Sequence, residues 1–277
     1  MDIIKASGEK EKFNKVKLYQ SLKRAGVQPK LAGKVCKTVA KSIRHGMNSG
    51  EILDQTTKCL QEENPILAAR YNLKRAIMEL GPAGFLFEKY IAEILKEYGY
   101  TTKVGSIVKG YCISHEIDVV VRKGKKHFMI ECKYHNNRGI RSDVKVALYV
   151  YARFLDVKKA WEKKPGHQYF FHQAWLVTNT KCTSEAIRYA RCAGLKIISW
   201  RYPKDKSLEC LIEKKGLYPI TILPSLTKYA KEMLAKKRIV LAKDLLKYSL
   251  HDLVRLTGLQ SNITRKLQEE TKQLCLR

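Results

Sequence analysis

The chain has 277 residues, 45% of them apolar, and its 54 Lys and Arg outnumber its 26 Asp and Glu to give a net charge of +28. These values predict a folded protein with a sizeable core and more than one domain. The apolar runs are too short to span a bilayer and no apolar leader opens the chain, so we expect neither membrane association nor secretion. The 8 cysteines include no CxxC pair, which argues against zinc ribbons and disulfide scaffolds and favours a cytoplasmic protein.

The positive charge is spread along the whole chain rather than confined to a tail. A surface this basic attracts a polyanion, and nucleic acid is the first candidate. The alternative is that the charge serves only solubility. That alternative is less favoured because like charges repel one another at a cost in stability.

The N-terminal segment has the pattern of a helical domain. Apolar residues recur every four positions over 31–43, and Ser49 can cap a second helix. Asn64 and Pro65 are a helix cap followed by proline at the first helical position, and the helix they begin ends at Gly81. The proline that follows predicts the end of the first domain.

The central part of the chain alternates between helix and strand patterns, which predicts an α/β fold. The stretch AWLVTNT, a helix capped at Thr183 or Ser184, and the stretch LKIISW form a strand–helix–strand unit, for which we expect parallel strands. The elements expected before this unit are a helix over 85–98, strands over 102–108, 117–122 and 127–134, and a helix over 143–161.

The last part of the chain is helical again, and we expect two helices around a tight turn at Gly258. The sequence therefore predicts a multi-domain α/β protein of three regions. They are an N-terminal helical domain (1–81), a central α/β domain with a mixed sheet (82–223) and a C-terminal helical region (224–277).

Carboxylates interrupt the two central strands in the stretch HEIDVVVRKGKKHFMIECKYH. A two-residue turn at Gly124-Lys125 places Asp118 opposite Glu131, and the Cβ atoms of such neighbours lie about 4.5–5.5 Å apart. Two carboxylates this close repel each other unless a cation lies between them, and hard divalent cations prefer carboxylate oxygens. The alternative is a sheet edge whose polar face, which also carries Lys133, is simply solvated.

At these residues the chain resembles the PD-(D/E)XK nuclease superfamily, and within it the Mrr-like restriction endonucleases and their resolvase-like relatives, from about Gly84 to Trp200. The stretch GFLFEKYIAEILKEYGY resembles the leading helix, EIDVVV the strand with the aspartate, and IECK the Glu-x-Lys strand. WLVTNTKCTSEAIRYARCAGLKIISW resembles the closing βαβ unit. Many members have a glutamine on the helix after the Glu-x-Lys strand. SDVKVALYVYARF has none, and Lys145 or Asn136 are the candidates to replace it.

The resemblance implies a restriction-endonuclease-like core that uses Mg²⁺ or Mn²⁺, with Glu88, Asp118, Glu131 and Lys133 as catalytic residues. Asp118 and Glu131 would bind the metal, and Glu88 would be a further or water-mediated ligand. Lys133 would orient the attacking water or neutralise the developing charge. For Glu88 a solvated ion pair is the alternative, because this residue borders the apolar stripe of its helix.

The N-terminal segment resembles the ATP-cone, a small helical domain that binds ATP or dATP, through IIKASG, KFNKVKLYQSLKRAG and NPILAARYNLKRAI. Ala6 departs from the family, which usually has arginine there. A basic helical bundle without a ligand is the alternative. The resemblance implies a nucleotide site built from Lys5, Glu11, Asn14, Lys17, Arg70 and Lys74.

The C-terminal TGLQSNITRKLQEETKQL resembles a helix-hairpin-helix, whose turn amides contact a DNA phosphate. Helices that only pack together are the alternative. The leading hypothesis is a metal-dependent endonuclease that acts on double-stranded or branched DNA and is modulated by ATP or dATP. A nucleotide-sensing DNA-binding regulator with an inactive nuclease fold and an RNA-processing nuclease are the alternatives. The sequence leaves open whether the protein is a homo-oligomer.

Overall fold

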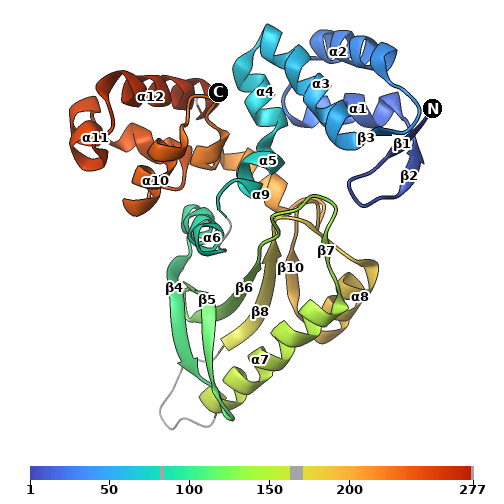
Figure 1. Cartoon of the computed structure of the whole chain (residues 1–277). Coiled ribbons are helices and arrows are strands. Elements are labelled where there is room, and N and C mark those ends of the chain that lie inside the picture. Colours follow the sequence, from blue (N-terminus) through green and yellow to red (C-terminus); the bar gives the residue numbers. More distant parts are fainter. Residues whose placement is uncertain (82–83, 163–170, 276–277) are drawn as a thin grey trace. The chain divides into compact units, whose positions relative to one another are not determined.

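The chain forms two compact units in the computed structural model, which describes residues 1–81, 84–162 and 171–275 (Figure 1). We call the unit of residues 80–136 and 140–217 the sheet unit. The other, the helical unit, contains residues 1–79, 137–139 and 218–277. The breaks at 79 and 217 lie near the predicted domain ends at 81 and 223, and the C-terminal residues cluster with the N-terminal ones. Pro82, at the predicted seam, lies outside the described residues.

The sheet unit is built on a mixed five-stranded sheet with the strand order β10-β8-β6-β5-β4. Strands β4, β5 and β6 pair antiparallel, whereas β6, β8 and β10 pair parallel. A separate two-stranded sheet joins β7 (Arg141–Ser142) to β9 (Lys181–Cys182). The strands of the main sheet are β4 (Thr101–Lys109), β5 (Ser114–Lys123), β6 (Lys126–Lys133), β8 (Phe171–Thr178) and β10 (Lys196–Ile198).

The helices of the sheet unit follow the predicted pattern. Parallel neighbours need a crossover connection, and α7 (Val144–Glu162) supplies it between β6 and β8. The next crossover is α8 (Ser184–Ala193), whose predicted cap Thr183 is confirmed because its side chain accepts the N–H of Ala186. The unit also contains α6 (Phe85–Glu97) and α9 (Leu208–Lys215).

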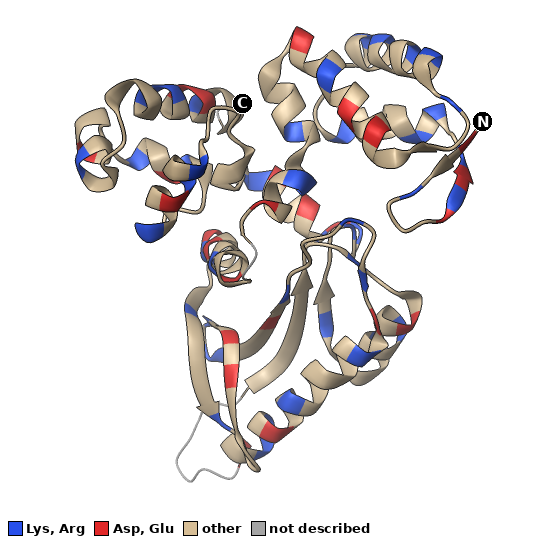
Figure 2. Ribbon diagram, viewed as in Figure 1, with Lys and Arg blue, Asp and Glu red and all other residues tan. Residues whose placement is uncertain are grey.

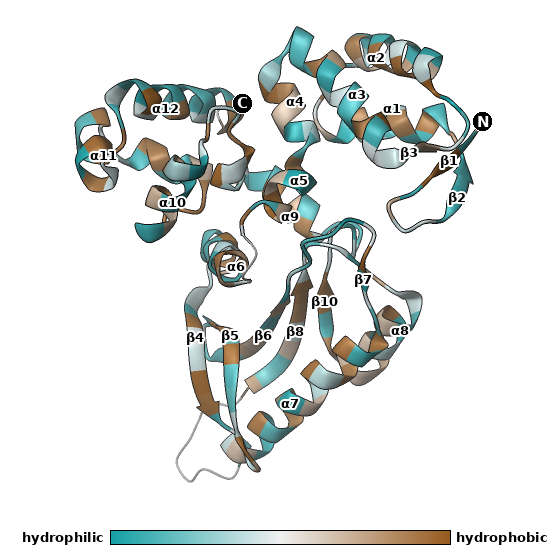
Figure 3. Cartoon of the chain, viewed as in Figure 1, coloured by the Kyte–Doolittle hydropathy of each residue, from teal (hydrophilic) through white to brown (hydrophobic). Residues whose placement is uncertain are grey.

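Helices cover the sheet and bury its apolar side chains. Met129 of β6 is fully buried in one cluster with Ala147 and Val150 of α7. Helix α6 packs against β4, β5 and β6 and buries Phe87 completely. Figure 3 shows the apolar stretches of these strands and helices. The predicted polar face of β6 is therefore covered by α7 at Met129 and is not simply solvated.

The helical unit begins with a small sheet that the sequence analysis does not predict. Strands β1 (Asp2–Ile4), β2 (Lys10–Lys12) and β3 (Met47–Asn48) pair in the order β2-β1-β3. Each has only two or three residues, too few to show an alternating pattern. The helices that follow are α1 (Lys15–Arg24), α2 (Pro29–Ser42), α3 (Ser49–Glu63), α4 (Pro65–Tyr71) and α5 (Leu73–Met78).

Two details of these helices differ from the prediction and one confirms it. The cap of α3 is Asn48 rather than Ser49: the Asn48 side chain accepts the N–H of Gly50 at 2.7 Å. The single helix expected up to Gly81 is divided into α4 and α5 at Asn72. Asn64 caps α4 as predicted, accepting the N–H groups of the first helical turn.

The C-terminal part of the helical unit contains the expected pair of helices. Helix α11 (Leu250–Thr257) ends at Gly258, whose φ of +71° suits glycine, and α12 (Ser261–Cys275) follows directly. Before this pair lie the 3₁₀ helix η1 (Ile220–Ile222), helix α10 (Lys228–Lys236) and the 3₁₀ helix η2 (Ala242–Lys247). Of the helices described, none combines the length and the hydrophobicity that a bilayer crossing requires.

The segment 137–139 belongs to the helical unit although it follows β6 closely in the sequence. Gly139 has a φ of +91°, and a Cβ atom there would lie 2.3 Å from the carbonyl oxygen of Ala6. Only glycine fits this close approach of two backbones.

Candidate active site

Asp118 lies at a point where the backbone pairing of the sheet is interrupted. The ladder between β5 and β6 ends at Val119 and Ile130, so Asp118 and Glu131 are the next positions on the two strands. This register confirms the predicted turn. On the other side, the residues flanking Asp118 pair with β4, but Asp118 itself, opposite Gly105, does not. The Asp118 carboxylate instead accepts the N–H of Cys132 at 2.7 Å.

Glu131 is held by an arginine that the sequence analysis does not identify. Arg153 of α7 forms an ion pair with the Glu131 carboxylate and donates a second hydrogen bond to the backbone carbonyl of Glu116. The two side chains are mostly buried, with 17% of Glu131 and 11% of Arg153 exposed. Arg153 therefore links β5 and β6 just beyond the end of their ladder.

The sequence does contain a signal for Arg153. It follows Val150 by three residues and precedes Val157 by four, and both valines are fully buried, so Arg153 lies in the apolar stripe of α7. A charged residue in such a stripe needs a buried partner. The two replacements proposed from the sequence for the missing glutamine are Lys145, which is exposed at the start of α7, and Asn136. The structure shows Arg153, rather than Lys145, in contact with Glu131.

The three predicted carboxylates influence one another electrostatically. Burial raises the pKa of Glu88 to about 7, and the charges of Asp118 and Glu116 add to the effect. Burial and the charge of Asp118 likewise raise the pKa of Glu131 to about 7, although Arg153 opposes this. Burial also raises the pKa of Asp118, against the N–H of Cys132 and the charge of Arg153. Burial and mutual repulsion therefore outweigh the effect of the nearby cations on these three carboxyl groups. Figure 2 shows that Lys and Arg residues lie among the Asp and Glu residues of the sheet unit.

Lys133 is exposed at the end of β6, two residues after Glu131. Side chains two residues apart on a strand point to the same side, so Lys133 lies on the same side of the sheet as Glu131. Its charge also opposes the rise in the pKa of Asp118, after the larger effects of burial, the Cys132 N–H and Arg153. The structure thus brings Asp118, in the middle of β5, together with Glu131 and Lys133 at the end of β6, and Glu88 is contributed by α6.

The carboxylates at this site fit a hard divalent cation whose other coordination positions are filled by water and by substrate phosphates. Among the described residues, no three His, Cys, Asp or Glu side chains are gathered closely enough to form a metal site by themselves. Mg²⁺ is commonly bound through one or two carboxylates, several waters and substrate phosphates, so three protein ligands are not required. Two crowded carboxylates with raised pKa values are the kind of group that such a cation would stabilise.

Four of the six residues predicted to bind nucleotide lie together in the helical unit. Glu11 forms ion pairs with Lys5 at 2.7 Å and Lys17 at 2.8 Å. Asn14 caps α1 and accepts the N–H of Lys17 at 3.1 Å. The hydrogen bonds from Lys17 and then Lys5 lower the pKa of Glu11 to about 2. The predicted positive and polar groups are present at the first turn of α1.

Arg70 lies at the other end of α1. Its Nε donates to the hydroxyl of Tyr218 at 2.9 Å, and a Cβ atom on Gly26, just past α1, would lie 3.4 Å from its Nη1. Helix α1 has 10 residues, which is about 15 Å of rise. Lys74 is in α5. The six residues therefore do not form one compact group in this structure.

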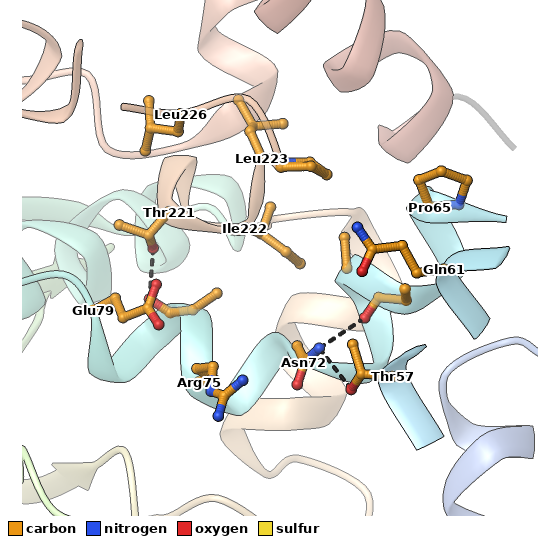
Figure 4. A pocket seen from close by; sticks show the side chains of 14 residues that line it. Thr57, Gln61, Pro65, Asn72, Arg75, Glu79, Thr221, Ile222, Leu223 and Leu226 are labelled. Carbon is orange, nitrogen blue, oxygen red and sulfur yellow. Dashed lines mark hydrogen bonds between the residues drawn. The ribbon is translucent and has the colours of Figure 1, made fainter. Parts of the chain in front are cut away.

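The helical unit also contains a pocket of about 270 Å³, formed between α3, α4, α5 and the segment 221–226 (Figure 4). The amide of Asn72 lies in its wall and donates to the Thr57 hydroxyl at 2.9 Å. Gln61, Arg75, Glu79 and Thr221 supply further polar groups. None of the six residues predicted to bind nucleotide lines this pocket, so it is distinct from the predicted site.

Comparison with known proteins defines the class of protein. Residues 83–201 match the restriction endonuclease family, over nearly the same span as the predicted nuclease core. Residues 218–275 match the family described as AF1548-like, C-terminal. This chain therefore carries a restriction endonuclease domain, which indicates a nuclease and implies nucleic acid binding.

Two comparisons find similarity over about two thirds of the chain. An uncharacterized protein of Archaeoglobus fulgidus is 39% identical over 184 residues, covering 66% of this chain and 99% of the relative. The crystal structure of AF1548, a protein of unknown function, matches with 38% identity and a TM-score of 0.59 over 69% of this chain and 98% of that one. The chain belongs to the AF1548-like family. Neither family match extends over residues 1–82, and the ATP-cone resemblance stays a prediction.

Proposed function

We propose that this protein is a divalent-metal-dependent endonuclease that hydrolyses phosphodiester bonds in DNA, and that ATP or dATP binding to the N-terminal segment modulates it. The observation that carries the proposal is the position of Asp118 beside buried Glu131 and exposed Lys133 at the interrupted end of the β5–β6 ladder. This arrangement lies inside the restriction endonuclease domain.

Each residue has a distinct task in this mechanism. Asp118 and Glu131 would hold Mg²⁺ or Mn²⁺, and the bound ion would polarise the scissile phosphate and favour ionisation of the attacking water. Arg153 keeps the Glu131 carboxylate oriented, since it is hydrogen-bonded to β5 at the same time. Lys133 would neutralise the charge that develops on the phosphate, and Glu88 would hold a water or a further position of the ion.

The proposed role of nucleotide rests on the exposed cluster at the start of α1. A triphosphate needs several positive donors, and the chain has no glycine-rich P-loop to supply them. Lys5 and Lys17 could turn from Glu11 toward phosphate oxygens. Arg70 and Lys74 lie apart from this cluster, so they would contact the nucleotide only if the helices that carry them moved toward it. Such a site would bind ATP or dATP without hydrolysing it.

A direct test of the nuclease uses Lys133→Ala with Lys126→Ala as the matched control. Both lysines are exposed and lie at opposite ends of β6, so neither substitution disturbs the core. Relaxation of supercoiled plasmid should require Mg²⁺ or Mn²⁺ and stop with EDTA. Lys133→Ala should be about a hundredfold slower, whereas Lys126→Ala should remain near wild type. Equal activity of the two variants would contradict the assignment of Lys133.

The same assay separates the alternative functions. A DNA-binding regulator with an inactive nuclease fold would bind plasmid but never cut it, and an RNA-processing nuclease would cut RNA in preference to DNA. The intact set of Asp118, Glu131 and Lys133 favours activity over an inactive fold.

A further inference from the structure

Three exposed aromatic rings of the sheet unit each have a cation on one face. Phe85 is 52% exposed with Lys89 Nζ 3.9 Å from its ring centroid. Tyr149 is 59% exposed with the Arg153 guanidinium carbon 5.2 Å away. Tyr111, 49% exposed, has Lys159 Nζ at 4.0 Å. Because about half of each of these residues remains exposed to solvent, their side chains contribute little to the core.

Two of these rings flank the carboxylates from different helices. Phe85 precedes Glu88 by three residues on α6, and side chains with that spacing are neighbours on a helix surface. Tyr149 lies one turn before Arg153 on α7, and Arg153 is paired with Glu131. Each of the two helices that carry residues of the candidate active site, α6 and α7, therefore also carries an exposed aromatic side chain next to one of those residues.

The third ring, Tyr111, is in the loop between β4 and β5 and lies beside α7, further along the helix than Tyr149. The carboxylate of Asp156 accepts the N–H groups of Cys112 at 2.7 Å and Ile113 at 3.3 Å, and its backbone carbonyl accepts the N–H of Tyr111 at 3.0 Å. These contacts fix the β4–β5 loop on the helix. Lys159, beside Tyr111, follows Tyr149 by ten residues, or about 15 Å of helix.

We propose that Phe85, Tyr149 and Tyr111 stack on unpaired bases, so that the preferred DNA has a single-stranded arm beside the scissile phosphate, as in a fork or flap. The inference rests on the proposed function and narrows its substrate. Open aromatic faces combined with cations are the usual means of holding single strands, because every base has a face on which a ring can stack. In an intact duplex those faces are occupied by neighbouring bases, and exposing them requires unstacking.

The test measures binding without cleavage, by fluorescence anisotropy in EDTA, with a single strand, a blunt duplex and a fork of equal length. Wild type should prefer the fork and the single strand. Phe85→Ala and Tyr149→Ala should each weaken binding of these two probes by about five- to a hundredfold and leave duplex binding within about twofold. Tyr229→Ala is the control, because Tyr229 is 58% exposed on α10 in the other unit, and should behave as wild type.

A second pair of variants, both at Tyr149, distinguishes stacking of the ring on a base from simple apolar contact with it. Tyr149→Phe keeps the ring and Tyr149→Leu removes it while retaining bulk. A 2-aminopurine in the fork arm should change in fluorescence on binding to wild type and Tyr149→Phe, but not to Tyr149→Leu. Equal wild-type affinity for duplex and fork, or a 2-aminopurine fluorescence change with Tyr149→Leu as large as that with wild type, would overturn the inference. Cutting of the same probes by wild type in Mg²⁺ is measured separately. If no probe is cut, the proposed nuclease function is wrong. If the probes are cut without a preference for unpaired arms, only this inference is wrong.

Discussion

Two clusters of charged side chains, one in each unit, show how burial changes the properties of the same residue types. Glu11 of the helical unit is partly exposed, with 27% of its side chain in solvent, and its hydrogen bonds from Lys17 and Lys5 lower its pKa to about 2. Glu131 of the sheet unit is also paired, with Arg153, yet burial raises its pKa to about 7. Two lysines outweigh the effect of burial on Glu11, whereas burial and the charge of Asp118 outweigh the single arginine beside Glu131.

The difference indicates which kind of ligand each cluster can accept. The carboxylates of the sheet unit are partly buried and repel one another, and Arg153 and Lys133 do not fully offset these effects, so a further cation would stabilise them. The lysines around Glu11 are in exposed ion pairs, which are weak and easily exchanged. A polyphosphate could therefore compete with Glu11 for them.

Removing one buried carboxylate should have the largest effect. Asp118→Asn or Glu131→Gln should lower plasmid cleavage by at least about a hundredfold, because the metal loses a charged ligand. DNA binding should survive or tighten, since negative charge facing the phosphates is lost. Glu11→Gln, the counterpart in the exposed cluster, should cut like wild type without nucleotide. Full activity in both buried-site variants would remove the basis of the metal assignment.

Metal affinity should depend on pH in the sheet unit. A cation binds the ionised carboxylates, and protons compete with it below the pKa of about 7 of Glu88 and Glu131. Mn²⁺ binding measured by calorimetry should tighten by roughly tenfold or more between pH 6 and pH 8. Without metal the sign for stability is opposite: a raised pKa favours the protonated folded state, so stability should fall as the pH rises through 7. A pH-independent Mn²⁺ affinity would contradict the crowding of these carboxylates.

Arg153 should affect the site through Glu131. Arg153→Gln should weaken Mn²⁺ binding or slow cleavage by about 10- to 100-fold, because Glu131 loses the group that orients it. Arg153→Lys should recover part of the loss, since lysine keeps the charge but cannot bridge two acceptors in the same way. Lys145→Ala, the substitution at the position suggested by the sequence, should be near wild type. If Lys145→Ala slows cleavage and Arg153→Gln does not, Lys145 rather than Arg153 takes the place of the missing glutamine.

The exposed cluster should give the smallest effect. Lys17→Ala should weaken ATP or dATP binding by about tenfold in calorimetry, the loss expected for one charge-assisted contact of about 1.4 kcal/mol. Lys15→Ala, an exposed neighbour, is the control. If nucleotide changes the affinity for DNA, DNA must change the affinity for nucleotide by the same factor. Unchanged binding with Lys17→Ala, or no binding by wild type, would leave this cluster as an ordinary set of surface ion pairs.

The hairpin and its carboxylates could be predicted from the sequence because their signals are local. Alternation along β5 and β6 and a turn at Gly124 are enough to place Asp118 next to Glu131. The crossover helices and the Thr183 cap follow from equally short patterns. The Lys133 position comes from the same strand.

The remaining parts of the site depend on contacts between distant segments. Arg153 reaches Glu131 from a helix 22 positions away, and its location in an apolar stripe indicates only that it needs a partner. The strands β1, β2 and β3 are too short to carry a pattern, and each is fixed by its neighbours in the fold. The association of 137–139 with the helical unit depends on a close backbone approach at Gly139, which no local rule predicts.

The pairing of β6 also determines when the site can form during folding. On one side β6 joins β5 through a tight turn, whereas on the other side Glu131 lies opposite Leu176 in β8. Contacts between neighbouring segments form quickly, and pairing with a distant strand is slower. A nascent chain that has not yet reached β8 would hold Asp118 and Glu131 in a hairpin without the strand that pairs with the other edge of β6. We therefore expect chains truncated before residue 171 to lack nuclease activity, so that cutting begins only after β8 has paired with β6.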